Sequence, residues 1–418
     1  HIIIDEGHTL MEQCYDFFAE EFSSMEFLEK LDMIDKGHPN IIWLLQNLNG
    51  SYGFRETIEK DKIMYLVNDI IVNLNLLMND FRTMRLASGE YGFVTEFFIP
   101  RDELKDITKY LLPEVSSIKE SIYPLYKLLE TYVSNIVLDD EVTGDNDFKT
   151  LNDYIIKLKS TFDMLDKFIE PSVFYAKILE IDNEYKEFRL KNVPLNVGEL
   201  VNEHMLKDVK STTFLSATLR IENSYNRIKK HLGQERAKEF FIPSLFDLKK
   251  QTKIFALKDM GHYDDANYIN NISRFIYETS KRINGHILVL FNNNMRRNSV
   301  YEELEMLTRG SKIEVHTNKK SINILNDKNR NAIILGTKGF FEGIDVPGDG
   351  LSCVMLDKLP NHSPEYPILR AVTKYQHKNY QDFNYPQLCI KVKQIYGRLV
   401  RSTYDYGYFI ILDPGENQ

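Results

Sequence analysis

The spacing of apolar residues changes twice along this chain, and these changes limit the folds available to it. From about residue 11 to residue 185, apolar residues recur at three- and four-residue steps, as on an amphipathic or buried helix. One stripe consists of seven such residues: Ile63, Leu66, Ile70, Leu74, Leu77, Phe81 and Met84. Segments near 101–137 and 148–185 repeat the pattern, and turn-forming residues at 89–92 and 143–146 predict breaks. The sequence therefore predicts an all-helical domain over 11–185.

From about residue 210 onward, short apolar runs alternate with helical stretches such as 266–283. The runs that we expect to be strands are 213–215, 253–257, 286–291, 312–316, 332–335, 351–356 and 408–412. Alternation of this kind favours parallel strands joined by crossover helices. We therefore predict an α/β domain of the RecA-like type in this part of the chain.

An apolar strand at residues 2–4 runs directly into Asp5, Glu6, Gly7 and His8. In nucleotide-driven motors, a buried parallel strand of this kind supplies an Asp that holds Mg²⁺ and a Glu that polarises the attacking water. A surface acidic pair after a strand is an equally common alternative. No phosphate-binding loop of the form GxxxxGK[ST] occurs in the 418 residues. The pattern indicates the back part of an ATP-driven machine, and we expect this chain alone to be inactive as an ATPase.

Two polar segments follow expected strands downstream, and each has a plain alternative. Ser216-Ala-Thr could hydrogen-bond across to the acidic strand, or it could be an ordinary strand end. The run 286–291 leads into Asn292 and Asn293, with Arg296 close behind. Donors at the start of a helix can hold a nucleic-acid phosphate. Taken alone, this second segment is better explained as a helix cap followed by a solvated basic turn.

The glycine-rich segment 336–348 lets the backbone approach a ligand closely. Thr337 can donate to a phosphate, while Lys338 and Phe341 offer charge and stacking surface to a single strand. Core packing is the alternative for at least one of Phe340 and Phe341.

The strongest motif is Gln394-Ile-Tyr-Gly-Arg-Leu-Val-Arg401. On a helix, steps of four and three residues place Gln394, Arg398 and Arg401 on one face. Two guanidinium groups facing a γ-phosphate would act as arginine fingers. A salt-bridged surface helix is the alternative.

Composition restricts the remaining classes. The net charge of −9 argues against a generally basic nucleic-acid coat, although a local positive groove remains compatible with it. Only three cysteines occur, Cys14, Cys353 and Cys389, which suits a reducing cytoplasm, predicts buried or half-buried thiols, and excludes a four-cysteine iron–sulfur cluster within this chain. No apolar run is long enough to span a membrane. A zinc hydrolase using Asp5, Glu6 and His8 is disfavoured, because these residues are clustered rather than spaced at i and i+4.

The acidic strand, Ser-Ala-Thr, the strand with its polar turn, the glycine-rich loop and the Gln-Arg-Arg motif occur in the order found in superfamily 2 helicases. Four further stretches are more specific: 194–198 (PLNVG), 342–351 (EGIDVPGDGL), 357–360 (DKLP) and 363–364 (SP). On these residues the chain resembles the DinG/XPD branch of DNA helicases, and bacterial DinG more than XPD. The resemblance covers nearly the whole chain and is densest from about residue 188.

The resemblance implies two RecA-like motor domains, one partial and one complete, with a large all-helical arch domain inserted. The partial first motor domain would comprise 1–10 and 186–225, the arch 11–185, and the second motor domain 226–418. The 207 residues between His8 and Ser216 leave room for such an insertion.

The resemblance also implies site residues. Asp5 would hold Mg²⁺ and Glu6 would activate water within a DEAH-box-like motif that includes His8, although Gly7 replaces the usual Ala. Gln394 would lie near the γ-phosphate of ATP, with Arg398 and Arg401 as fingers. Glu342, Gly343 and Asp345 would connect the nucleotide to the DNA side. The expected nucleic-acid contacts are Thr218, Phe291, Asn292, Asn293, Arg296, Thr337, Lys338 and Phe341.

The implied cofactors are ATP and Mg²⁺, and the implied partners are single-stranded DNA, rather than RNA, and an upstream part of the same protein. Some relatives carry an upstream 3′→5′ exonuclease domain, so a role in DNA repair that includes degradation is compatible with the resemblance. We expect a cytoplasmic monomer. The alternative is an ATPase-inactive, helicase-like scaffold that binds nucleic acid and regulates a neighbouring nuclease domain.

Overall fold

The computed structural model describes most of the chain, in two compact units. The described residues are 1–36, 40–54, 57–88, 95–98, 104–134, 144–170, 172–182, 186–258, 260–261, 265, 267–283, 286–327, 329–337, 340, 350–361, 366–376, 379–400 and 402–413. Unit 1 contains His1–Thr9, Asp208–Ser363 and Tyr380–Gln418, and unit 2 contains Leu10–Lys207 and Pro364–Asn379.

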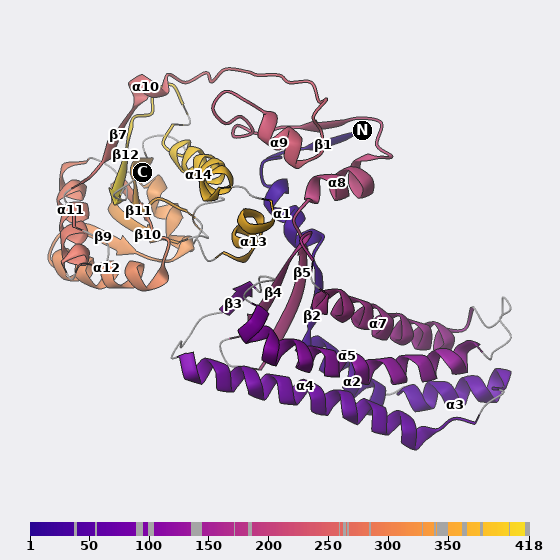
Figure 1. Ribbon diagram of the computed structural model, residues 1–418. Helices are drawn as coiled ribbons and strands as arrows, with labels where there is room; N and C mark the ends of the chain where they lie inside the picture. The colour runs from indigo at the N-terminus through magenta and orange to yellow at the C-terminus, as the bar shows by residue number, and fades with distance from the viewer. Residues whose placement is uncertain are drawn as a thin grey trace. The chain divides into compact units, whose positions relative to one another are not determined.

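The centre of unit 1 is a six-stranded parallel sheet of order β7-β12-β11-β8-β10-β9 (Figure 1). Its strands are β7 (Thr252–Ala256), β8 (His286–Leu290), β9 (Ile313–His316), β10 (Asn331–Gly336), β11 (Leu351–Lys358) and β12 (Gly407–Asp413). Six of the seven strands expected in this part of the chain are therefore confirmed here, each within two residues of its predicted ends. The α/β fold class is confirmed as well.

Both faces of the inner strands β8, β10 and β11 are buried, which explains why these strands are largely apolar. Ile287 and Val289 of β8 join a core cluster with helices α11 (Tyr268–Arg282) and α12 (Asn294–Leu307). Leu288 and Leu290, which alternate with them, join a second cluster with the end of α14 (Tyr380–Tyr396). Successive side chains of one strand thus fill two different cores.

A second, two-stranded parallel sheet in unit 1 joins β1 (Ile2–Ile4) to β6 (Thr212–Phe214), with Ile3 opposite Thr213. The parallel pairing agrees with the expected acidic strand, and β6 is the seventh predicted strand. The burial expected for β1 is wrong for this chain, because the side chain of Ile3 is 72% exposed. A sheet of two strands has no neighbours to cover it. The remaining short helices of this unit are α9 (Asn226–His231), α10 (Leu248–Gln251) and the 3₁₀ segment η2 (Lys319–Asn326).

Unit 2 is built largely from helices that pack around one apolar core (Figure 1). They are α1 (Leu10–Phe17), α2 (Ser24–Lys36), α3 (Ile41–Tyr52), α4 (Lys60–Ser88), α5 (Leu104–Ser134), α7 (Asn146–Ile169), α8 (Val197–Val201), the π-helical turn η1 (Asn202–Leu206) and α13 (Pro367–Tyr375). The predicted apolar stripe lies on α4, where Ile63, Leu74 and Phe81 are buried. The predicted break before α7 is also present, because the carboxylate of Asp145 accepts hydrogen bonds from the first free N–H groups of that helix.

The prediction that 11–185 is all-helical needs a correction. Unit 2 contains an antiparallel sheet of order β2-β5-β4-β3, formed by β2 (Glu20–Ser23), β3 (Thr95–Phe98), β4 (Tyr175–Ile181) and β5 (Phe188–Pro194). β2 and β3 have four residues each, too few for a clear two-residue period. β4 is buried at four consecutive positions, so its sequence does not alternate. The helix expected to run to residue 185 ends at Ile169.

The compact units also divide the chain differently from the predicted domains. β5, which we placed in the first motor domain, pairs with β2 and β4 of unit 2. The segment 364–379, predicted within the second motor domain, also falls in unit 2. There α13 packs against β3 and β4, and the Gln376 side-chain amide donates to the carbonyl oxygen of Leu195 (3.1 Å).

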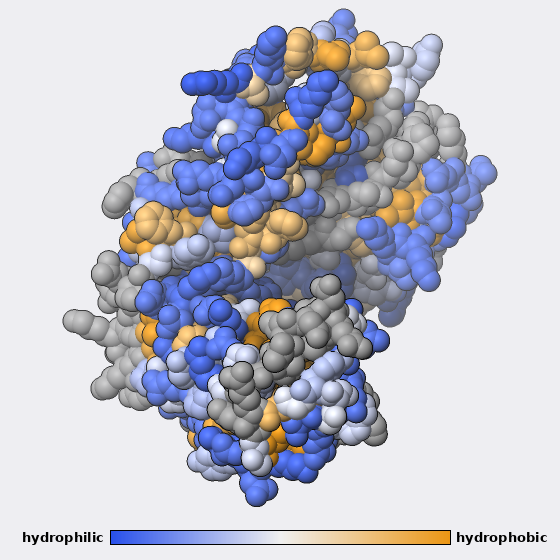
Figure 2. All heavy atoms as spheres, turned by 90° about the vertical axis from the view of Figure 1, so that its right-hand side faces the viewer, coloured by the Kyte–Doolittle hydropathy of each residue, from blue (hydrophilic) through white to orange (hydrophobic). Residues whose placement is uncertain are grey.

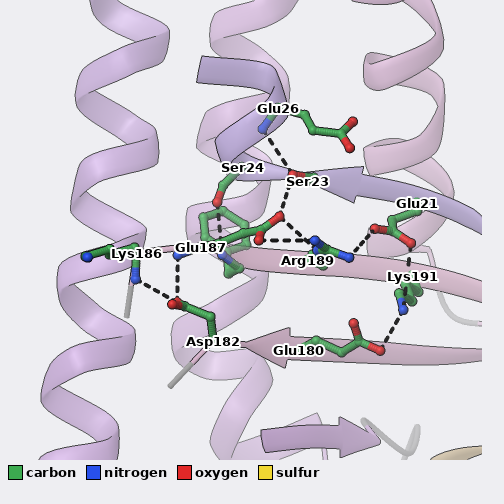
Figure 3. Close-up of polar contacts among 11 residues, drawn as sticks. Glu21, Ser23, Ser24, Glu26, Glu180, Asp182, Lys186, Glu187, Arg189 and Lys191 are labelled. Carbon is green, nitrogen blue, oxygen red and sulfur yellow. Dashed lines mark hydrogen bonds and ion pairs between the residues drawn. The ribbon is translucent and has the colours of Figure 1, made fainter. Parts of the chain in front are cut away.

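Complementary charges set the register on one face of the antiparallel sheet (Figure 3). The carboxylate of Glu21 on β2 lies 3.5 Å from Arg189 and 3.7 Å from Lys191, both on β5. Lys191 also contacts Glu180 on β4 (2.7 Å). Opposite charges on neighbouring strands favour this pairing over a shifted register.

The side chain of Lys177 on β4 ties the sheet to the end of α7. Its ammonium group donates to the carbonyl oxygens of Lys167 (2.9 Å), Phe168 (2.6 Å) and Glu170. The last carbonyls of a helix lack partners within the helix, and the helix dipole favours a cation beside them. Burial lowers the pKa of Lys177 to about 8, so the charged form still predominates at neutral pH.

We predict that Lys177→Met destabilises the chain by about 1.5–3 kcal/mol, the usual value of hydrogen bonds to a charged group. Lys167→Met is the matched control, because Lys167 is half-exposed and pairs with Glu20 at the surface. Surface pairs contribute about 0–1 kcal/mol. Thermal unfolding, with hydrogen exchange across the last turn of α7, measures both. Equal losses in the two variants would show that the buried contact has no special role.

Candidate nucleotide-hydrolysis site

The pairing of β1 with β6 brings the ends of both strands to one place. The N–H of Leu215 donates to the carbonyl oxygen of Ile4 (2.8 Å), and the N–H of Gly7 donates to that of Leu215 (2.9 Å). Because the strands are parallel, the turn at 5–8 lies beside the segment 215–218. The acidic turn and Ser-Ala-Thr are thus neighbours, as the sequence suggested.

Glu6 holds an uncommon backbone conformation within this turn. Its φ is 49°, in the left-handed region that residues other than glycine seldom adopt. The carbonyl oxygen of Glu6 accepts two hydrogen bonds from Thr9, one from the N–H and one from Oγ1, both at 2.9 Å. Such conformations persist only where surrounding contacts fix them, and they cluster at functional sites.

Four side chains form a continuous chain of hydrogen bonds at this point. The Gln394 amide nitrogen lies 2.5 Å from Nε2 of His8, and Nδ1 of His8 lies 2.8 Å from Oγ of Ser216. The Ser216 hydroxyl donates to Oε2 of Glu6 at 2.7 Å. The four residues come from α14, the acidic turn and the end of β6. This chain, Gln394–His8–Ser216–Glu6, is called the relay below.

The relay has a definite direction. An amide N–H can only donate, so Nε2 of His8 accepts from Gln394. The ring proton therefore lies on Nδ1 and points to Ser216, whose own proton points to Glu6. Each hydrogen bond of the relay then has one donor and one acceptor. His8 is 6% exposed and the Glu6 side chain is 60% exposed, while Ser216 and Gln394 are partly buried, so the carboxylate end of the relay is the most open to solvent.

Asp5 is suited to hold a metal ion only with help from other groups. Its carboxylate is exposed, and Oδ1 accepts from the N–H of Glu6 (2.9 Å). Within the described part of the chain, no group of three or more His, Cys, Asp or Glu side chains could bind a metal. Mg²⁺ characteristically takes one or two carboxylates and completes its shell with water and phosphate oxygens. The residues therefore fit a nucleotide-bound Mg²⁺.

The predicted helical face of Gln394, Arg398 and Arg401 is wrong in one respect. α14 ends at Tyr396, and Arg398 lies in the turn that follows. Beyond Gly397 the N–H groups of Arg398 and Leu399 bond three residues back instead of four. Arg398 is 9% exposed and Arg401 lies outside the described residues.

The polar segment after β8 is largely engaged within the protein. The Asn293 side chain caps α12, as the plain alternative predicted, and Asn292 donates to the carbonyl oxygen of Leu359 (3.0 Å). Arg296 pairs with Asp357 at 2.9 Å, and Asp357 is fully buried. Phe291 was expected to contact nucleic acid. Its side chain cannot do so, because it is fully buried in the core beside the sheet.

Asp357 and Tyr268 were not foreseen as part of this arrangement. The Tyr268 hydroxyl donates to Oδ1 of Asp357 (3.1 Å), opposite the oxygen that binds Arg296. A signal existed, because Asp357 follows an apolar strand just as Asp5 does. The expected contact Thr218 is also engaged: it is 4% exposed, and its N–H and hydroxyl both lie 3.1 Å from Oγ of Ser216.

The glycine-rich segment is described only at its start. A Cβ at Gly336 would lie 2.4 Å from Cγ of Phe340, so only glycine fits there. Phe340 is 6% exposed, which confirms the core alternative for one phenylalanine of the pair. Thr337 is half-buried, and its carbonyl oxygen accepts from the N–H of Phe340 (2.7 Å). The other predicted residues of this segment, Lys338, Phe341, Glu342, Gly343 and Asp345, lie outside the described residues.

The three thiols follow the prediction that they are buried or half-buried. Cys14 and Cys353 are buried and Cys389 is partly so. Burial raises the pKa of Cys14 to about 11 and that of Cys353 to about 12, so both are unreactive thiols at neutral pH. Among the described helices, none is long and apolar enough to cross a bilayer.

Comparisons with known proteins agree with this fold. Residues 276–415 match the family model of the helicase C-terminal domain. The chain is 24% identical over 430 residues to the 3'-5' exonuclease DinG of Staphylococcus aureus (strain MSSA476), covering 98% of this chain and 46% of that protein. It is 28% identical over 233 residues to the ATP-dependent DNA helicase YoaA of Escherichia coli (strain K12), covering 54% and 37%. The chain thus spans less than half the length of these relatives.

Among solved structures, S. tokodaii Xpd4 is similar with a TM-score of 0.51 and 16% identity, covering 99% of this chain and 71% of that one. This is a likeness of fold. The parallel sheet and the matched C-terminal domain indicate a helicase-type fold. By the matched C-terminal domain and by relatives that align over most of its length, the chain is similar to the DinG/XPD-like superfamily 2 helicases.

We predict that His8 is held as the Nδ1–H tautomer. Nitrogen-15 NMR of histidine-labelled protein above neutral pH distinguishes the two tautomers, and the signal lost in His8→Gln identifies the residue. Ser216→Ala removes the nearer acceptor of the Nδ1 proton, leaving Oε2 of Glu6 at 3.2 Å, and should shift the population towards the other tautomer. An Nε2–H tautomer in the unmodified chain would reverse the direction of the relay.

Proposed function

We propose that this chain is the C-terminal part of a DinG-like, ATP-dependent DNA helicase or translocase. The observation that carries the proposal is the relay, which links the end of an acidic parallel strand, a Ser-Ala-Thr segment and the Gln394 helix. A motor must couple hydrolysis to movement, and a hydrogen-bonded path between separate elements is suited to that coupling.

Glu6 is the proposed base for the attacking water. It is the more exposed end of the relay, and the Ser216 hydroxyl fixes one of its oxygens while the other can meet the water. His8 holds Ser216 in place through Nδ1. Gln394 and Arg398 are proposed to face the γ-phosphate, and Arg401 with them by position in the sequence. Charge stabilisation by such arginines is worth on the order of 10³–10⁵ in rate in phosphoryl transfer.

Asp5 is proposed to hold the Mg²⁺ that accompanies ATP. The bound ion would supply charge neutralisation at the phosphates. The phosphate-binding loop that would hold the nucleotide does not occur in this sequence. We propose that it lies upstream in a longer protein, in agreement with the greater length of the relatives.

Single-stranded DNA is the proposed partner. One relative is named a DNA helicase and another a 3'-5' exonuclease. An attached nuclease is therefore part of the proposal for the longer protein. Because contacts to phosphate are electrostatic, the affinity for DNA should fall as the salt concentration rises. RNA should be tested as a competitor, because phosphate contacts and base stacking can bind single-stranded RNA as well as single-stranded DNA.

The second candidate is an inactive helicase-like scaffold that regulates an attached nuclease. The exposed side chain of Glu6 alone does not distinguish the two candidates. A scaffold would keep DNA binding and lack turnover.

We predict that Glu6→Gln lowers single-strand-stimulated ATP hydrolysis by roughly 10²–10⁴-fold, the usual contribution of a positioned base. The measurement needs the protein with its native upstream sequence. Binding of single-stranded DNA should be unchanged, because Glu6 is assigned to the water and not to the strand. Glu302→Gln, at an exposed position of α12, is the matched control and should leave the rate unchanged. Equal rates for the two variants, or no turnover in the unmodified protein, would favour the scaffold.

A further inference from the structure

The segment that joins α14 to β12, residues 397–406, carries Arg398 and is called the arginine turn below. Connecting segments usually run over the protein surface, and the surface in Figure 2 is mostly hydrophilic, with apolar atoms in smaller patches. Leu399 and Val400 of the arginine turn are instead buried in a core cluster. The turn that carries Arg398 is therefore packed against the interior of the protein.

The start of the arginine turn is anchored to Thr252, the first residue of β7. The hydroxyl proton of Thr252 goes to the carbonyl oxygen of Leu248 (2.7 Å). The Tyr396 hydroxyl contacts the same Thr252 oxygen, so it is the donor in that pair. The ring of Tyr396 meets the ring of Phe409 edge-on, with the centroids 5.7 Å apart. The last residue of α14 is thus fixed to both β7 and β12.

The end of the arginine turn is anchored to Gln251, the residue before β7. Its side-chain amide donates to the carbonyl oxygens of Ser402 (2.8 Å) and Asp405 (3.0 Å), which uses both amide protons. Asp405 is 3% exposed, and its carboxylate accepts from the N–H (2.7 Å) and the hydroxyl (2.5 Å) of Ser402. Because Gln251 is itself only 5% exposed, this end of the turn is closed by buried hydrogen bonds.

The pairing of β7 with β12 explains how two consecutive residues reach both ends of the turn. Thr252 lies opposite Gly407, the first residue of β12, although these strands are far apart in the sequence. The turn also packs closely against that strand, because a Cβ at Gly407 would lie 2.7 Å from Cδ2 of Leu399. Arg398 therefore lies between two anchors that come from a single point at the edge of the sheet.

We propose that Gln251 and Thr252 are positioning residues that hold Arg398 for the γ-phosphate. A guanidinium group stabilises a transition state best when its position is fixed before the reaction, because no reorganisation is then needed. A displacement of about 1 Å can lower a rate on the order of 10²-fold. The inference rests on the proposed function, and it assigns a role to two residues that none of the sequence motifs contains.

The test uses the protein with its native upstream sequence and compares two ligands. ADP with aluminium fluoride imitates the transition state of phosphoryl transfer, and a non-hydrolysable ATP analogue imitates the ground state. Gln251→Met removes both amide donors at similar length, and Thr252→Val removes only the hydroxyl, so the test does not depend on the folding of one variant. Asn331→Leu is the matched control, because it removes an amide that donates to the carbonyl oxygen of Ser280 (2.9 Å) between β10 and α11.

We expect Gln251→Met to lower kcat and the affinity for the aluminium fluoride complex by the same factor, roughly 10- to 100-fold. The KM for ATP and the affinity for the non-hydrolysable analogue should be unchanged, because Arg398 acts in the transition state. Thr252→Val should change the same two quantities in the same direction, and Asn331→Leu should change neither. In a protein that carries Arg398→Ala, Gln251→Met should cause no further loss of affinity for the aluminium fluoride complex.

Two results overturn the inference. Folded variants of Gln251 and Thr252 that bind the aluminium fluoride complex as tightly as the unmodified protein exclude a positioning role. A loss that is equal for both ligands, or that adds to the loss in Arg398→Ala, indicates a general structural role. In both cases the unmodified protein still hydrolyses ATP, so the proposed function stands. If the unmodified protein hydrolyses no ATP, the proposed function fails and the inference fails with it.

Discussion

The parallel pairing of β1 with β6 is the constraint on which the candidate site depends. It places Glu6 beside Ser216 although these residues are 210 positions apart in the sequence. Two backbone hydrogen bonds, from Leu215 to Ile4 and from Gly7 to Leu215, fix the register at the point where both strands end. A shift by one residue would turn the side chains of β1 to the opposite face. The relay and the left-handed conformation of Glu6 would then be lost together.

The six-stranded sheet positions the other part of the site, which is Gln394 on α14. It does so by packing of buried side chains and not by pairing of strands. Alternate residues of β8 fill two separate cores, which fixes α14 against one face of the sheet. α14 in turn carries Gln394 to His8. The ion pair joins Arg296 of α12 to the buried Asp357 near the end of β11, and the Tyr268 hydroxyl donates to the other oxygen of Asp357. A buried charge is tolerated only with such partners, so this group is better explained as a fixed support of the strand ends than as a freely moving contact.

Sequence alone predicted the strands of unit 1 because each is an apolar run between turn residues. It also predicted the neighbourhood of Glu6 and Ser216, since parallel strands end at one edge. The antiparallel sheet of unit 2 could not be predicted the same way: β2 is too short to show a period, and β4 is buried on both faces. The predicted helical face of Gln394 and Arg398 was wrong because α14 ends at Tyr396, two residues before Arg398, and spacing cannot reveal a helix end. The predicted nucleic-acid contact of Phe291 was wrong because the sequence does not show whether the last apolar residue of a strand is buried or exposed.

The central claim is that the acidic turn, the end of β6 and the end of α14 bind one nucleotide. Hydrogen exchange of the protein with its upstream sequence, with and without a non-hydrolysable ATP analogue and Mg²⁺, tests this most directly. We expect slower exchange in all three segments, residues 5–9, 214–218 and 392–398, because a ligand that joins them suppresses their separate opening. Bound analogue with unchanged exchange in these segments would contradict the claim and place the nucleotide elsewhere.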